Sequence, residues 1–322
     1  MKKITALIIC AVLTIGILAS CTAAPVNTGD KLSIVTTIFP EYDWVKNILG
    51  SMSDKADVTM LLDTGVDLHN YQPTADDIIK ITTCDLFIYV GGESDKWVDD
   101  VLKDSSDKPV VINLCDVLSE NLKEEELKEG MQGEEEAEEG EEEIEYDEHV
   151  WLSLKNASVI CQHIADKLCE LDSANAEAYK ANAQSYISKI NALDEQYAQA
   201  VSESEVKTLV FADRFPFRYM TDDYSIDYYA AFIGCSAETE ASFETIKFLA
   251  KKVDELSLNC VITLEGSDDR IAKTVIANTE TKDKEMLVLN SMQSTTGEQV
   301  KEGADYLAIM TSNLEVLKQA LK

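Results

Sequence analysis

The longest helical signal in the chain lies near its middle, where residues 174–202 read ANAEAYKANAQSYISKINALDEQYAQAVS. This stretch contains neither proline nor glycine, and most of its residues are strong helix formers. Apolar side chains recur at helical spacing along one stripe, namely Tyr179, Ala183, Tyr186, Ile190, Leu193 and Tyr197. A helix of about 28 residues is about 42 Å long at 1.5 Å per residue. We therefore predict one long helix that acts as a strut between the parts of the chain on either side.

Short apolar runs alternate with helical stretches on both sides of this strut, which is typical of βα units with parallel sheets. The expected strands are 32–37, 58–62, 86–90 and 110–114 before the strut, and 208–212, 227–232, 261–264 and 286–289 after it. The expected shorter helices are 42–49, 75–81, 97–102, 157–171, 243–256, 270–278 and 299–321. The sequence thus predicts an α/β fold of two similar βα-repeat domains with parallel sheets, joined by one long central helix.

The length of 322 residues also favours two domains, because a single hydrophobic core rarely grows beyond about 250–300 residues. We place an N-terminal α/β domain at 31–172, the linking helix at 173–203 and a C-terminal α/β domain at 204–322.

The N-terminus resembles a secretory signal: Lys2 and Lys3 precede an apolar run from Ile4 to Leu18. About 15 apolar residues are too few for a spanning helix, which needs roughly 20. The run ends in Leu-Ala-Ser-Cys21, which resembles the lipobox of bacterial lipoproteins. We expect a signal peptide at 1–20, lipidation of Cys21, a tether over 21–30, and a location at the extracytoplasmic face of the cell membrane.

The formal net charge of −32 argues against nucleic acid as a partner, because phosphate binding needs a basic surface. Residues 120–148 alone hold 16 acidic side chains against Lys123 and Lys128. Like charges repel one another, so we predict a disordered loop inserted after a strand. Two interpretations remain open: a solvated insertion, or a low-affinity collector of cations beside a tighter site.

Six cysteines remain after the signal and Cys21 are set aside: Cys84, Cys115, Cys161, Cys169, Cys235 and Cys260. None belongs to a CxxC pair, so the spacing does not support a thiolate zinc site. The sequence leaves open whether these cysteines form disulfides or are small buried apolar residues.

Two of the three histidines follow an acidic residue at the same spacing, in Asp67-Leu68-His69 and Asp147-Glu148-His149. The carboxylate of such a tripeptide can fix one ring nitrogen and leave the other free for a metal. His163 lies instead in the predicted helix 157–171, beside its apolar stripe, and is interpreted as a structural residue.

The surroundings of both histidines resemble motifs of the solute-binding proteins of zinc and manganese ABC transporters. Residues 65–77 (GVDLHNYQPTADD) are similar to the family's Gly-x-Asp-x-His-x-x-Glu-Pro-Thr-x-x-Asp, and residues 147–152 (DEHVWL) to its Asp-Pro-His-x-Trp-Leu. The resemblance implies a metal in the cleft between the domains, held by three histidines, or two and a glutamate, plus a carboxylate. His69 and His149 match the ligands of the first domain.

The second domain departs from this pattern. Counting back from Phe217-Arg218-Tyr219, the family's ligand position falls on Arg214, which cannot bind a cation. Its neighbour Asp213 is therefore the candidate metal ligand. Arg214 and Arg218 would either hydrogen-bond to Asp213 and hold it in position, or form surface ion pairs with Asp222 and Asp223. The family's last aspartate falls near Asn290, an amide, so we expect Glu265, or else Glu240, to complete the ligand set.

The resemblance implies that the chain captures divalent zinc as the binding component of an ABC importer and delivers it to a permease with its ATPase. Imidazole ligands favour zinc over magnesium or calcium. Manganese binding and a metal-binding surface adhesin are the alternatives. We expect no enzyme, since the sequence has no HExxH, GxSxG or P-loop motif. We also expect a monomer.

Overall fold

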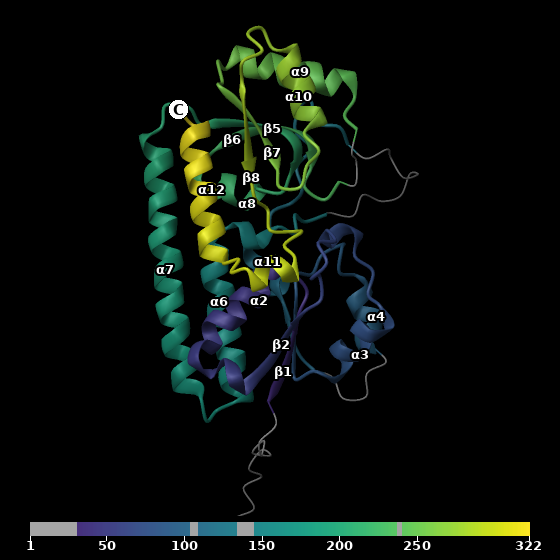
Figure 1. Cartoon of the computed structure of the whole chain (residues 1–322), viewed down its shortest axis with the longest axis vertical. Helices are drawn as coiled ribbons and strands as arrows, with labels where there is room; N and C mark the ends of the chain where they lie inside the picture. Colours follow the sequence, from purple (N-terminus) through teal and green to yellow (C-terminus); the bar gives the residue numbers. More distant parts are fainter. Residues whose placement is uncertain (1–30, 104–108, 134–144, 237–239) are drawn as a thin grey trace, which may run out of the picture. The chain divides into compact units, whose positions relative to one another are not determined.

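The computed structural model describes residues 31–103, 109–133, 145–236 and 240–322. The fold is built on two four-stranded parallel sheets (Figure 1). The first sheet has the order β2-β1-β3-β4, with β1 Leu32–Thr36, β2 Ala56–Met60, β3 Leu86–Tyr89 and β4 Val110–Asn113. The second has the order β6-β5-β7-β8, with β5 Thr208–Phe215, β6 Asp227–Ile233, β7 Cys260–Leu264 and β8 Glu285–Leu289. We call the parts built on these sheets the first and second lobes. All eight strands begin within two residues of their predicted positions.

Helices connect the strands of both lobes. In the first lobe they are α2 Phe39–Leu49, α3 Ala75–Thr83, α4 Trp97–Lys103, α5 Leu114–Val117 and α6 Leu154–Leu171, with short 3-10 turns η1 Gly50–Lys55 and η3 Ser119–Asn121. In the second they are α8 Arg218–Tyr224, α9 Phe243–Glu255, α10 Arg270–Asn278, α11 Gly297–Lys301 and α12 Tyr306–Ala320. The central strands β3 and β7 are buried along their whole length, as expected for parallel strands covered on both faces. The α/β prediction is confirmed.

The predicted strut is present as α7, which runs from Ala176 to Glu203. All six side chains of its predicted apolar stripe are buried. The helix packs against α2 and α6 of the first lobe and against α12, which lies beside it in Figure 1. It therefore spans both lobes along one side. The exact domain boundaries stay a prediction.

The predicted helix 299–321 is wrong, because the structure has two helices there, α11 and α12. Gly303 lies between them with φ +101°, a backbone conformation that a continuing helix cannot adopt. Asp305 then caps the start of α12, since its Oδ1 accepts a hydrogen bond from the Ala308 amide at 2.8 Å.

In the segment 120–148, which the sequence predicts as a disordered loop, the structure places residues 120–133 and 145–148 against folded neighbours, and disorder of the segment stays a prediction. Glu125 N donates to Glu145 O at 2.9 Å, so the two ends of the segment run side by side. Gln132 N donates to Ala231 O of β6, also at 2.9 Å. Main-chain pairing with the second lobe thus offsets the charge repulsion in these parts. Residues 134–144 lie outside the described residues.

Asp43 of α2 joins three helices in the core. Its Oδ2 accepts hydrogen bonds from Tyr186 Oη of α7 at 3.1 Å and from the Tyr306 amide at the start of α12 at 3.3 Å. The Tyr306 hydroxyl in turn donates to Trp151 O at 2.8 Å, and the Trp151 indole donates to Ser291 O of the second lobe at 2.8 Å. This chain of polar contacts connects the two lobes behind the loops that hold the histidines.

The six cysteines named above are free thiols, so among the described residues the open disulfide question is answered in favour of unpaired side chains. The predicted signal, the lipobox Cys21 and the tether lie outside the described residues. Within the described ranges, no helix is both long enough and apolar enough to cross a membrane.

Replacing Asp43 with asparagine tests the polar core contact through its pH dependence. Burial, with the charge of Asp305, raises the pKa of Asp43 to about 7. A carboxyl whose folded pKa lies above its unfolded value stabilises the fold at low pH, and that contribution is lost as pH rises through 7. Between pH 5 and 8.5, wild type should therefore lose on the order of 2 kcal/mol of unfolding free energy relative to Asp43→Asn. Urea unfolding at both pH values measures this difference, with the exposed Asp54→Asn as control. Equal pH slopes in wild type and Asp43→Asn would contradict it.

Candidate metal centre

His69 is positioned by a short turn that follows β2. The turn is the 3-10 helix η2, Leu68–Asn70, and Asp67 caps it, since its Oδ1 accepts a hydrogen bond from the His69 amide at 3.1 Å. The ring Nδ1 of His69 lies 2.7 Å from Ser94 Oγ. A hydroxyl oxygen can accept the Nδ1 proton, which leaves Nε2 as the free lone pair.

His149 is fixed in the same way by Asp147, at the start of the 3-10 turn η4, Val150–Leu152. Asp147 Oδ1 accepts from the His149 amide at 2.8 Å and lies 3.0 Å from its ring Nδ1. The carboxylate therefore holds the proton on Nδ1 and directs Nε2 away from itself. The residue is 0% exposed.

The two Nε2 atoms of His69 and His149 face each other at 3.1 Å, and the ring planes are tilted by 59°. Two zinc–nitrogen bonds of about 2.0–2.1 Å at the tetrahedral angle would place their nitrogens roughly 3.3 Å apart. The structure thus brings the two histidines to a spacing close to that of a zinc site. They come from turns 80 residues apart in the sequence.

A proton added to this pair resides on His149. Burial and the charge of His149 lower the pKa of His69 to about 3. Burial also disfavours the charged form of His149, but the charge and hydrogen bond of Asp147 outweigh it and raise the pKa of His149 above its ordinary value. His69 therefore keeps a free lone pair at neutral pH.

Gln293 of the second lobe touches both histidines. Its Nε2 lies 2.9 Å from His69 Nε2 and 2.8 Å from His149 Nε2. An amide NH₂ group can only donate, so with both rings neutral each Nε2 accepts from it. Gln293 lies three residues after Asn290, near which the family resemblance places the last ligand. In the structure Asn290 Oδ1 accepts from the Met292 amide at 2.8 Å and stabilises the turn.

Asp213 and Glu265 do not join the histidines in a common group among the described residues. Asp213 Oδ2 accepts from Thr263 Oγ1 at 2.8 Å and ties β5 to β7. Glu265 accepts from the amide and the hydroxyl of Ser291, both at 2.7 Å. Glu240 is exposed and lies 3.9 Å from Arg270. The structure therefore brings together two of the four predicted ligands, and the ligand role of all four stays a prediction.

Neither arginine near this site has the pairing expected from the sequence. Arg214 reaches across to the first lobe, where its Nη2 donates to Asp67 Oδ2 at 2.7 Å. This pair lies beside a cavity of about 350 Å³ lined by residues of both lobes. Arg218 Nη2 lies 3.6 Å from Glu126 of the acidic segment. The Arg214 guanidinium therefore pairs with Asp67, while only its main-chain amide donates to Asp213 Oδ1, at 2.9 Å.

Cys235 is a functional candidate that sequence reasoning missed. Its Sγ and one ring nitrogen each of His69 and His149 all lie within 4.8 Å of one another. The sequence contains no CxxC pair, so its cysteine spacing predicts no thiolate ligand. A single cysteine that packing brings to two distant histidines leaves no such spacing signal.

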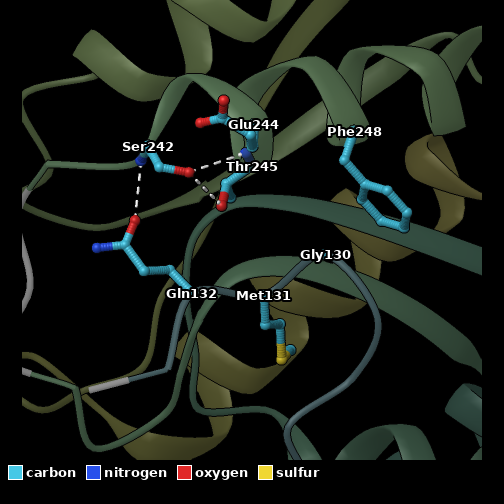
Figure 2. A pocket seen from close by; sticks show the side chains of 7 residues that line it. All are labelled: Gly130, Met131, Gln132, Ser242, Glu244, Thr245 and Phe248. Carbon is cyan, nitrogen blue, oxygen red and sulfur yellow. Dashed lines mark hydrogen bonds between the residues drawn. The ribbon is translucent and has the colours of Figure 1, made fainter. Parts of the chain in front are cut away.

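His163 and a further pocket lie outside this group. His163 is on α6, whose apolar stripe of Ile160, Ile164 and Leu168 is buried as predicted. Figure 2 shows a pocket of about 380 Å³ between residues 130–132 and the start of α9. There Gln132 Oε1 accepts from the Ser242 amide at 2.8 Å. This pocket shares no lining residue with the histidine pair, and we assign the metal chemistry to the histidines.

Comparisons with known proteins show the family of this chain. The family described as "Zinc-uptake complex component A periplasmic" matches residues 34–320. The "Zinc-binding protein AdcA" of Streptococcus pyogenes is 31% identical over 303 residues, which cover 92% of this chain and 57% of the relative. The "Zinc-binding lipoprotein AdcA" of Streptococcus pneumoniae is 33% identical over 323 residues, covering 99% of this chain and 61% of the relative. The chain thus spans about three fifths of these relatives.

A solved structure shows the same fold. The crystal structure of the Zn(II)-bound ZnuA-like domain of Streptococcus pneumoniae AdcA has a TM-score of 0.71 and 29% identity, covering 90% of this chain and 99% of that one. The relatives are named for zinc binding, in agreement with the prediction of a binding protein and not an enzyme. The resemblance inferred from the two histidine motifs is confirmed: this chain belongs to the ZnuA family of zinc-uptake proteins.

Proposed function

We propose that this protein is the binding component of an ABC importer, which captures zinc between its lobes and delivers it to a membrane permease energised by an ATPase. The observation that carries the proposal is the buried pair of Nε2 atoms, 3.1 Å apart, on turns whose Nδ1 atoms already have partners. Neutral imidazoles suit zinc, while manganese prefers oxygen ligands. Manganese is therefore the competing cation in the tests below.

We further propose that Cys21 carries the lipid anchor, which would hold the protein at the extracytoplasmic face of the membrane. The lipobox-like sequence supports this, and one relative is named a lipoprotein. An anchored binding protein stays close to its permease, so capture and delivery happen at the same membrane.

Removing either histidine should abolish tight zinc binding. Each supplies one of two converging lone pairs, and both lie on turns outside the strands of the core. We expect His69→Ala and His149→Ala to lower zinc affinity by about a hundredfold or more in calorimetry, since even residues that only support a metal ligand often cost 10–100-fold. His163→Ala is the matched control and should bind as wild type does.

The transport role needs a cellular measurement. Cells that lack this protein should regain zinc accumulation when they produce wild type or His163→Ala, but not His149→Ala. Restoration by His149→Ala would reject the proposal. Restored manganese accumulation without zinc accumulation would assign the protein to manganese.

The roles of Asp213 and Glu265 can be separated from those of the histidines. In the structure Glu265 orders the 291–293 turn, and Asp213 joins two strands. We therefore expect Glu265→Gln and Asp213→Asn to weaken zinc binding by about tenfold or less, as supporting residues do. A loss as large as that of His149→Ala would show that the carboxylate binds the metal directly, as the sequence predicts.

Deleting residues 134–144 should leave the tight site intact and remove weaker binding events. The deletion removes eight acidic side chains but keeps residues 120–133 and 145–148, which contact the second lobe and the histidines. Carboxylates alone hold zinc loosely compared with imidazoles. Calorimetric titration should then show one tight event and fewer weak ones. Loss of the tight event would mean that this segment supplies a ligand.

A further inference from the structure

Resting on the proposed zinc function, we propose that the thiolate of Cys235 is the third protein ligand of the centre. The site would then take a soft divalent cation through two imidazoles and one sulfur. This goes beyond the ligands expected from the sequence, which come from histidines and carboxylates only.

The position of Cys235 depends on the turn that follows β6. A Cβ added at Gly234 would lie 2.9 Å from His149 Cε1 and 2.9 Å from Phe215 O. Only a glycine permits this approach, and the next residue brings its Sγ within 4.8 Å of ring nitrogens of both histidines. The thiol is half-buried and free of any disulfide.

The acidic segment holds this turn in place. The Cys235 amide donates to Glu125 Oε1 at 3.3 Å. Glu125 is itself paired through its main chain with Glu145, and Gln132 hydrogen-bonds to Ala231 in the strand that precedes the turn. Residues 125 and 132 of the segment therefore contact the turn that carries the thiol and the strand before it.

A buried carboxylate oxygen without a hydrogen-bond partner lies close to the histidines, on the Nδ1 side of His69. Glu148 is 1% exposed, and its Oε2 is buried with no hydrogen-bond partner, 3.8 Å from His69 Nδ1. Glu148 and Cys235 line one pocket of about 190 Å³, together with the exposed Glu93 and Glu145. The thiol thus lies between the histidine pair and an acidic pocket that opens to the surface.

A thiolate also suits the charge of this centre. Zinc with two neutral imidazoles carries +2, and burying that charge uncompensated is costly. Binding would form a sulfur–metal bond and break the S–H bond, with the proton released to water, because a coordinating thiol is deprotonated outright. Sulfur is a soft ligand, so the site would favour zinc and cadmium over manganese.

Cobalt(II) reports sulfur ligation directly, through thiolate-to-metal charge-transfer absorption in the near ultraviolet. With Co²⁺ as probe on the full chain, wild type and Cys169→Ser should show this band and Cys235→Ser should lack it. Zinc affinity of Cys235→Ser should fall about tenfold or more, at least the loss typical of residues that support a ligand. Cys169 is a matched control, since it is also half-buried but lies on α6 with its Sγ at 3.4 Å from Ala176 O.

Alkylation of the wild-type chain avoids the question of whether the variant folds. Zinc should protect Cys235 from iodoacetamide, as read by mass spectrometry, and leave Cys169 as reactive as before. Tight zinc binding with no charge-transfer band and no protection of Cys235 would overturn the thiolate and leave the proposed function standing. Absence of zinc and cobalt binding by wild type would overturn both.

Discussion

Two imidazole Nε2 atoms that face each other at 3.1 Å in a buried space are the constraint on which the site depends. When both rings are neutral, with the proton of each on Nδ1, their Nε2 lone pairs repel unless a positive or hydrogen-bearing group lies near both. In this structure the Gln293 amide takes that place, donating to each Nε2. A cation bound to both nitrogens would replace it. Asp147 and Ser94 maintain the arrangement, because each occupies the Nδ1 side of one ring and keeps its Nε2 lone pair free.

Buried contacts join the two lobes close to the site. His69 follows a strand of the first sheet, and Gln293 follows a strand of the second, at edges where ligands of parallel sheets commonly lie. The strut α7 covers both lobes on one side, and Trp151, two residues after His149, donates to Ser291 O across the lobes. Buried contacts thus hold the loop of Gln293 close to the loops of the two histidines.

Local patterns in the sequence were enough to predict the strands, the strut and the histidine pair. Apolar runs, helical periodicity and the Asp-x-His spacing act within a few residues and need no tertiary contact. The differences from the sequence expectations come from contacts between distant segments. Gln132 orders one end of the acidic segment by pairing with Ala231, about a hundred residues away, and Arg214 pairs with Asp67 across the lobes. The break at Gly303 is different, since a glycine inside an apolar pattern already signalled a possible helix end.

Arg214 also explains why this centre would need a new source of negative charge. It stands at the position where the family resemblance expects a ligand, yet it adds a positive charge and consumes the Asp67 carboxylate in an ion pair. The carboxylates of Asp147 and Glu148 and the thiol of Cys235 all lie close to the two histidines. These groups could therefore balance the positive charge of a cation bound between the two rings. The Arg214–Asp67 ion pair and the contact of Glu125 with the Cys235 amide are thus two charged contacts that the structure places around the same histidine pair.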